Sequence, residues 1–162
     1  MRFLPFRIVR YDETKAFKDM TLFEKFSFQL WKKMLDVNLS GVFNCCKVFG
    51  SQMVKQRKGT IVNVASIYGM VGTDQRIYGN SEINSPAPYA AAKGGIINLT
   101  RYLAAYWHKK NIRVNTLTPG GVLDKKYQKQ NFIETTVNQW LRYWKKENCK
   151  INPDYLKTLI MQ

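Results

Sequence analysis

The sequence lacks the features that mark metal-binding, disulfide-bonded and membrane proteins. It has three cysteines (Cys45, Cys46 and Cys149), none in a CxxC spacing, and one histidine. This excludes the usual cysteine and histidine zinc sites, and an odd cysteine count is typical of reduced thiols. No segment has the roughly 20 apolar residues that span a bilayer, and Pro5 interrupts the first apolar stretch, so no signal peptide is evident. We expect a cytoplasmic protein with no metal and no membrane association.

Acidic residues are also scarce. The 162 residues include 26 Lys and Arg but only 11 Asp and Glu, a formal net charge of +15. The basic excess is spread along the chain, which favours a solvated surface with weak attraction to polyanions over a specific nucleic-acid site. The alternative, polyanion binding by the segment 122–162, predicts an affinity that falls steeply with salt.

Glycine is absent before Gly41. A dinucleotide site needs a glycine-rich turn after its first strand, where backbone amides approach the pyrophosphate. The sequence contains no such turn ahead of its apolar elements.

The middle of the chain predicts a strand, a helix and a second strand. Residues 60–65 are a nearly continuous β-branched apolar run, typical of a central parallel strand, and residues 112–117 alternate before a Pro-Gly-Gly turn signal. Between them lie a long loop, 67–88, and a helix from Tyr89 that ends at Asn111. This order predicts a βαβ unit in a parallel sheet, with ligands at the carboxyl ends of the strands.

Two further helices are predicted from apolar spacing. Residues 22–56 contain no proline, and their apolar positions predict one long, largely buried helix: Trp31, Leu35, Val42, Cys46, Phe49 and Met53. In the C-terminal part, Val137, Trp140, Leu141 and Trp144 predict one amphipathic helix.

The pattern YxxxK places a phenol and an ammonium one turn apart on the same face of a helix. It occurs three times, at Tyr11, Tyr89 and Tyr106, so the spacing by itself is weak evidence. Only the Tyr89 copy opens a helix that lies between a buried strand ending at Ser66 and a second strand ending at Pro119.

In this order the motifs resemble the short-chain dehydrogenase/reductase family. The resemblance spans residues 23–122 and rests on Asp36-Val37-Asn38-Leu39, the run from Ile61 to Ser66, the YxxxK at Tyr89, Ile112-Arg113-Val114-Asn115 and Pro119-Gly120. It implies a Rossmann-like, doubly wound parallel sheet and an oxidoreductase that uses NAD or NADP on a small alcohol or carbonyl substrate. The segment Ser66-Ile67-Tyr68-Gly69, followed by Arg76-Ile77-Tyr78, is similar to the same region of bacterial members that act in flagellin or nonulosonic-acid sugar modification. This similarity implies a sugar-related substrate.

The resemblance also implies a catalytic tetrad, Asn38, Ser66, Tyr89 and Lys93. Tyr89 would exchange a proton with the substrate oxygen, which Ser66 would orient, and the ammonium of Lys93 would favour the phenolate. Asn38 would hold a water in a proton relay, while hydride transfer belongs to the cofactor.

The implied cofactor contacts are Tyr89, Lys93, Pro119, Gly120 and Val122. Each residue also has a plain structural interpretation: Asn38 bonded to helix backbone, Ser66 as a cap, and Tyr89 as a surface aromatic. The long loop with Tyr68, Asp74, Arg76 and Tyr78 is expected to shape the substrate pocket.

The sequence departs from the family at both ends. It lacks the glycine-rich turn, the Asn-Asn-Ala-Gly stretch and the last strand, so we expect one incomplete domain, 1–162, made of a family-like segment, 23–122, and a divergent basic tail, 123–162. An incomplete sheet exposes apolar edges, which favours a homo-oligomer. In this family the helices that hold Asn38 and Tyr89 commonly pack against a partner subunit. The alternative function is a catalytically inert remnant that acts at most as an oligomerising or interaction protein.

Overall fold

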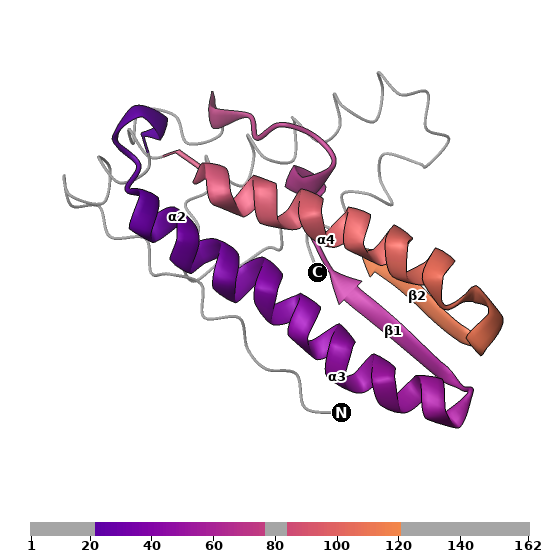
Figure 1. Ribbon diagram of the computed structural model, residues 1–162. Helices are drawn as coiled ribbons and strands as arrows, with labels where there is room; N and C mark the ends of the chain where they lie inside the picture. The colour runs from indigo at the N-terminus through magenta and orange to yellow at the C-terminus, as the bar shows by residue number, and fades with distance from the viewer. Residues whose placement is uncertain (1–21, 77–83, 121–162) are drawn as a thin grey trace, which may run out of the picture.

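The structure, a computed structural model, describes residues 22–76 and 84–120. These residues form a βαβ unit preceded by a long helical segment (Figure 1). Val122, Tyr11 and the helix expected around Trp140 lie outside the described residues, as does the tail 123–162.

Two strands form the sheet. β1, Gly59–Val64, and β2, Ile112–Leu117, pair in parallel, in register from Gly59 with Ile112 to Val64 with Leu117. Both predicted strands and the α/β class are therefore confirmed. Parallel pairing needs a crossover between the strands, and the helix between them supplies it.

The two faces of this sheet differ in burial. α3 and α4 pack on one face, where Asn63, Ile112 and Val114 are buried. On the other face Val62 is 58% exposed and Leu117 is 55% exposed. Among the described residues, the apolar run of β1 is therefore covered on one face and exposed on the other. Successive side chains of a strand point to opposite faces, and the described helices cover only one of them.

α4, Ala87–Tyr106, is the crossover helix and begins two residues before its predicted start. Pro88 lies in its first turn, where proline removes no helical hydrogen bond. Its buried residues after Pro88 recur at helical spacing, on the side of the helix that packs against the sheet and the helical segment before it: Ala92, Lys93, Ile96, Ile97, Thr100 and Leu103. After a short 3-10 turn, η5, His108–Lys110, the chain reverses at Asn111 in the left-handed conformation (φ 56°) and enters β2. The α-helix thus ends at Tyr106, before its predicted end at Asn111, and Asn111 caps η5 instead.

The helical segment before β1 has three consecutive parts: α2, Phe28–Leu35; a π-helical turn, η2, Asp36–Ser40; and α3, Gly41–Gln56. A 3-10 turn, η1, Phe23–Lys25, lies ahead of them. The side chain of Ser27 accepts a hydrogen bond from Leu30 N at 3.4 Å and caps α2. The prediction of one long helix is therefore confirmed from residue 28 onward.

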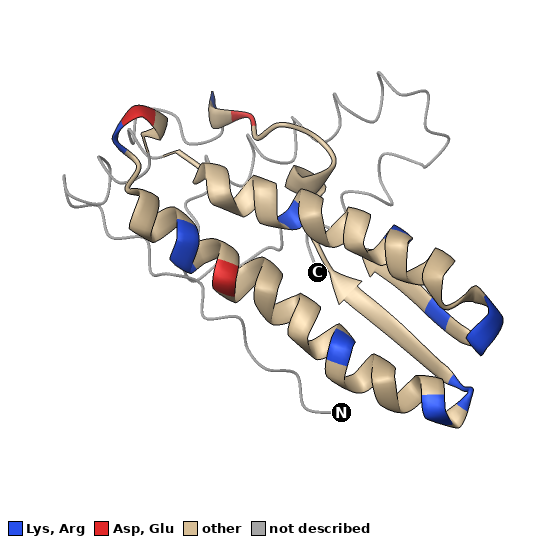
Figure 2. Cartoon of the chain, viewed as in Figure 1, with Lys and Arg blue, Asp and Glu red and all other residues tan. Residues whose placement is uncertain are grey.

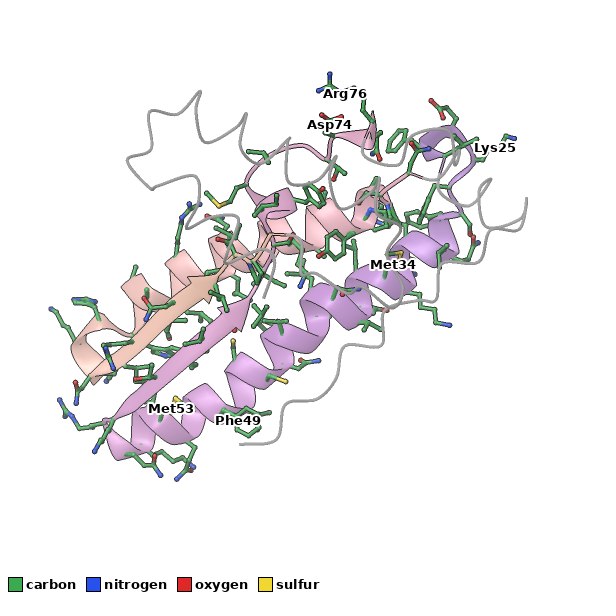
Figure 3. The ribbon with its side chains drawn as sticks, turned by 180° about the vertical axis from the view of Figure 1, so that it is seen from behind. Lys25, Met34, Phe49, Met53, Asp74 and Arg76 are labelled. Atoms are coloured by element: carbon green, nitrogen blue, oxygen red, sulfur yellow. The ribbon has the colours of Figure 1, made fainter. Side chains whose placement is uncertain are left out.

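The prediction that this helix is largely buried is wrong. Cys46 and Gly50 are its buried residues, and Phe49, expected on the apolar face, is 62% exposed and points away from the strands (Figure 3). Part of the predicted stripe does face the core, because Cys46 is buried and Val42 and Met53 pack against the same cluster. At the turn between Cys46 and Met53 the residue that faces inward is Gly50 rather than Phe49, and a Cβ at Gly50 would overlap the Trp107 ring.

Basic side chains gather at the amino-terminal ends of the strands (Figure 2). They lie near the C-termini of α3 and α4, where unpaired carbonyls carry partial negative charge: Lys55, Arg57, Lys58, Lys109, Lys110 and Arg113. A charge excess spread along the sequence therefore becomes a local cluster in the fold. Within the described ranges no helix combines the length and apolar character needed to cross a membrane.

Candidate functional site

Ser66 and Pro119 meet at the carboxyl ends of the two strands, as the βαβ order predicts. The strand pairing continues past β1 and β2, with Ala65 N donating to Leu117 O at 2.8 Å and Ile67 N donating to Pro119 O at 3.2 Å. Ser66 lies between these two bonds, so the backbone on both sides of it is fixed against the segment that leads to Pro119.

Ser66 is buried and serves as the N-cap of a 3-10 turn, η3, Ile67–Gly69. Its Oγ accepts a hydrogen bond from Tyr68 N at 3.3 Å, which is the structural role expected of a serine at a strand end. A hydroxyl that accepts one bond keeps its own O–H as a donor. The capping role is therefore compatible with a bond to a substrate oxygen.

Lys93 lies beside Tyr89 on α4. Its Nζ is 5.7 Å from the centroid of the Tyr89 ring and donates a hydrogen bond to Val64 O at 3.0 Å. The residue is only 4% exposed, and burial lowers the pKa of Lys93 below its ordinary value of 10.5. A buried ammonium is costly unless polar groups surround it, and a carbonyl and an aromatic face provide such groups here.

Gly69 lets the turn after Ser66 pack directly on α4. A Cβ at Gly69 would lie 2.5 Å from the carbonyl carbon of Lys93 and 2.7 Å from Gly94 N. Only glycine permits this approach of backbone to backbone. The contact joins the segment that carries Ser66 to the helix that carries Tyr89 and Lys93.

Asn38 lies in the π turn, where its Nδ2 donates to Met34 O at 2.9 Å. This is the local backbone bond of its plain structural interpretation. The turn packs against α4, because a Cβ at Gly95 would lie 3.0 Å from the Leu39 side chain. Asn38 is thus placed near the same stretch of α4, and its share in a proton relay stays a prediction.

The loop after Ser66 contains an exposed ion pair between Asp74 and Arg76 (Figure 3), with Arg76 Nε 2.8 Å from Asp74 Oδ1. This hydrogen bond lowers the pKa of Asp74. Gln75 Oε1 accepts a hydrogen bond from Ser85 N at 2.8 Å and holds the two described ends of the loop together. Tyr78 lies outside the described residues.

A hollow of about 400 Å³ lies between this loop, η1 and the first turn of α4. Its lining includes Thr73, Gln75 and Ser85 from the loop, and Ala87 and Ala90, which flank Tyr89 in sequence. The loop therefore lines a hollow near the start of α4, although Ser66, Tyr89 and Lys93 are not among its lining residues, and its role in shaping a substrate pocket stays a prediction.

The copy of YxxxK at Tyr106 has a different environment. Tyr106 ends α4, stacks on Tyr102 with ring centroids 5.8 Å apart and is 66% exposed, while Lys110 belongs to the exposed turn η5. Of the copies the structure describes, the one at Tyr89 has the buried lysine.

Sequence reasoning missed the roles of Gly69 and of the Val64 carbonyl. A signal for the first was present, because Gly94 and Gly95 follow Lys93 inside a helix, where glycine is costly and often marks close packing. The carbonyl carries no sequence signal, since every residue has one.

The donors and acceptors at this edge suit the nicotinamide-riboside half of a dinucleotide. The ammonium of Lys93 would face ribose hydroxyls, and the backbone of Pro119 and Gly120 follows β2 at the same edge. Pyrophosphate needs a glycine-rich turn. In the described ranges the first two glycines, Gly41 and Gly50, are inside α3, so these residues offer no such turn.

A parallel βαβ unit with polar groups gathered at the carboxyl ends of its strands is the arrangement found in Rossmann-like α/β folds. A family model described as short chain dehydrogenase matches residues 16–134, more than half of the sequence. The chain belongs to the short-chain dehydrogenase/reductase family, and the recognition made from its motifs is confirmed.

Individual relatives agree with this assignment. The 3-oxoacyl-(acyl-carrier-protein) reductase FabG of Thermotoga maritima is 39% identical over 111 residues, which cover 68% of this chain and 37% of that protein. A short chain dehydrogenase from Leptospira borgpetersenii, solved with bound NAD+, is 37% identical with a TM-score of 0.65, covering 73% of this chain and 44% of its own. A gluconate 5-dehydrogenase from Burkholderia cenocepacia, solved with NADP and tartrate, is 26% identical with a TM-score of 0.60, covering 71% and 43%. The chain spans about two fifths of the length of these relatives.

Proposed function

We propose that this chain carries the catalytic residues of an NAD- or NADP-dependent oxidoreductase that interconverts a small alcohol and its carbonyl. The observation that carries the proposal is the meeting of Ser66, the Tyr89–Lys93 pair and Pro119 at the carboxyl ends of two parallel strands. Membership of the short-chain dehydrogenase family supports oxidoreductase chemistry, and the residue types at this edge suit proton transfer to oxygen.

Each side chain has a distinct role in this proposal. In the reducing direction the Tyr89 hydroxyl donates its proton to the substrate oxygen, and in the oxidising direction the phenolate takes it back. The Lys93 ammonium, 5.7 Å from the ring centroid, stabilises the negative charge that develops on the phenol oxygen. Ser66 donates its O–H to the same substrate oxygen and orients it. A bound nicotinamide would supply or accept the hydride.

The cofactor contacts follow from the same edge. Lys93 would bind the ribose, and the backbone from Pro119 through Gly120 to Val122 would lie beside the nicotinamide. NAD+ and NADP are bound by different relatives, so either fits the family. The gluconate 5-dehydrogenase supports a polyhydroxylated, sugar-related substrate.

Self-association belongs to the same proposal. The helices that hold Asn38 and Tyr89 expose large apolar side chains that a partner copy would cover: Val37, Phe43, Val48, Phe49, Tyr102 and Tyr106. Sedimentation of the purified full chain tests this, and a monomer at all concentrations would contradict it.

Cofactor binding is the deciding experiment. The full chain is titrated with NADH and with NADPH, followed by cofactor fluorescence, for the wild type, Tyr89→Phe and Lys93→Ala. We expect saturable binding that weakens by on the order of tenfold in Lys93→Ala, because a charged hydrogen bond is lost. Tyr106→Phe and Lys110→Ala, in the exposed copy of the same motif, are matched controls and should bind like the wild type.

The inert alternative makes the opposite prediction. The lack of a glycine-rich turn in the described ranges favours it, because pyrophosphate then has no backbone cradle there. No binding of either cofactor at millimolar concentration would establish the inert reading. Binding that Lys110→Ala weakens as much as Lys93→Ala would show a non-specific attraction to basic side chains.

A further inference from the structure

A buried polar network links three elements of the fold away from the candidate site. Asn63 on β1 donates from Nδ2 to Thr100 Oγ1 on α4 at 2.9 Å, and Thr100 Oγ1 donates to Ile96 O at 2.9 Å. Cys46 on α3 donates from Sγ to Asn63 Oδ1 at 3.5 Å. Asn63, Thr100 and Cys46 are 7%, 4% and 4% exposed, so water does not replace these bonds easily.

This network fixes the position of α4 along the length of β1. Apolar contacts tolerate small displacements, but a buried amide is costly unless its partners are within hydrogen-bond distance. A slip of α4 by one helical turn, about 5.4 Å, would separate Thr100 from Asn63 and leave the amide unsatisfied. The amide therefore discriminates between positions of α4 that the apolar stripe alone would allow.

The same displacement would move the candidate site. Thr100 follows Lys93 by about two helical turns, so both side chains lie on the face that packs on β1. Asn63 immediately precedes Val64, whose carbonyl accepts the Lys93 hydrogen bond, and it lies three residues before Ser66. Two side-chain bonds, Asn63–Thr100 and Lys93–Val64, thus connect α4 to neighbouring residues of one strand.

We propose that Asn63 is a positioning residue. Through its bond to Thr100 it fixes the position of α4 along β1, and with it the positions of Tyr89 and Lys93 relative to Ser66. The consequence of this positioning for catalysis rests on the proposed function. The displacement of Lys93 when the Asn63–Thr100 bond is removed can be measured without cofactor. In this role Asn63 touches neither substrate nor nicotinamide and acts through α4.

The test uses the full chain with Asn63→Leu combined with Thr100→Val. Replacing both polar partners with apolar groups of similar shape leaves little unsatisfied, so the fold is retained. The position of Lys93 is measured by the pH titration of its ε-carbon in NMR, assigned by Lys93→Met. Burial against Val64 lowers this pKa in the wild type. We expect the midpoint in the double variant to return toward 10.5 by about half a pH unit or more, because Lys93 leaves its buried place.

Controls separate position from stability. Ile97→Val removes a buried methylene next to the network without touching a polar partner, and its Lys93 titration should match the wild type. Thr100→Ser keeps the hydroxyl and should also match. An unchanged Lys93 midpoint in the folded double variant would overturn the proposal. If that variant does not fold, the Lys93 titration is compared between Thr100→Val and Thr100→Ser. A midpoint that shifts in Thr100→Val alone supports the proposal, and equal midpoints in the two variants overturn it.

Cofactor titration then distinguishes the two proposals. If the wild type binds NADH or NADPH, the double variant should bind on the order of tenfold more weakly, as expected when the charged hydrogen bond from Lys93 is lost. If the wild type binds neither, the proposed function fails, while the Lys93 titration still supports or overturns the role of Asn63.

Discussion

The two faces of the β1–β2 sheet are built from similar residues but have different surroundings. The helix-covered face has Ile112 and Val114 packed with Cys46 and Trp107, and it also contains the buried polar groups. The open face presents Val62, Val64 and Leu117 with no cover from the described residues. The comparison shows that the face covered by α3 and α4 determines both the core and the placement of the site, although the strand sequences do not reveal which face this is.

The largest effect that would break this contrast is expected at Gly69, on the covered side. Gly69→Ala places a Cβ 2.6 Å from the carbonyl oxygen of Lys93, so backbone must shift. We expect a loss of about 3 kcal/mol in the free energy of unfolding, measured by urea denaturation. Gly72→Ala, where a Cβ would meet no atom within 4 Å, is the matched control and should be neutral or slightly stabilising. Equal effects at the two glycines would contradict the packing of η3 on α4.

A valine on each face provides the next test. Val114 is 6% exposed on the covered face, and Val114→Ala should cost about 2 kcal/mol through lost burial and a residual cavity. Val62→Ala, on the open face, should cost much less, because its side chain already contacts water. Chemical denaturation of both variants gives the comparison, and a similar loss at both positions would show that both faces are covered.

A smaller effect sharpens the description of the open face. Val64→Thr keeps the branched shape and adds a hydroxyl at a residue that is 42% exposed. We expect a change within about 0.5 kcal/mol, as for other surface substitutions. A loss above about 1 kcal/mol, measured in the same way, would indicate that a second copy or another part of the chain buries this face.

The last test is a pH slope, which concerns the buried lysine on the covered side. Burial lowers the pKa of Lys93 in the folded state below 10.5, so the unfolded state binds more protons between the two values. The free energy of unfolding therefore gains a contribution as pH rises through that window, and this contribution is missing at lower pH. Lys93→Met removes it. The difference in unfolding free energy, wild type minus variant, should rise between neutral pH and pH 10.5, and a falling difference would contradict the buried ammonium.

The sequence predicts the βαβ unit well because its signals are local and strong. The apolar run at 60–65, the turn after Pro119 and the spacing within α4 each identify an element, and their order brings Ser66 and Lys93 to one edge. The π turn at Asp36–Ser40 has no comparable signal in the sequence. The exposure of Phe49 has none either, because its apolar spacing with Cys46 and Met53 does not reveal that Gly50 packs against Trp107 instead. Burial of one sheet face also depends on tertiary packing rather than on the strand.

For the candidate site, the sequence predicts which residues take part but not which atoms they contact. The family resemblance implies Asn38, Ser66, Tyr89 and Lys93 as the tetrad. The structure adds that Ser66 caps a turn and that Lys93 bonds to Val64 O. Asn63 and Thr100 lie 37 positions apart, and single-residue propensity does not reveal that they pair.

The parallel register also has a consequence for the order of folding. Partners such as Thr60 and Arg113 are 53 positions apart along the chain, and every pair in the ladder has the same separation. The entropy of closing so long a loop must be overcome before any strand contact forms. We therefore expect α4 to collapse onto each strand separately at first, with β1 and β2 pairing late. The sheet, although it is the centre of the molecule, would then be a product of the folding transition rather than its nucleus.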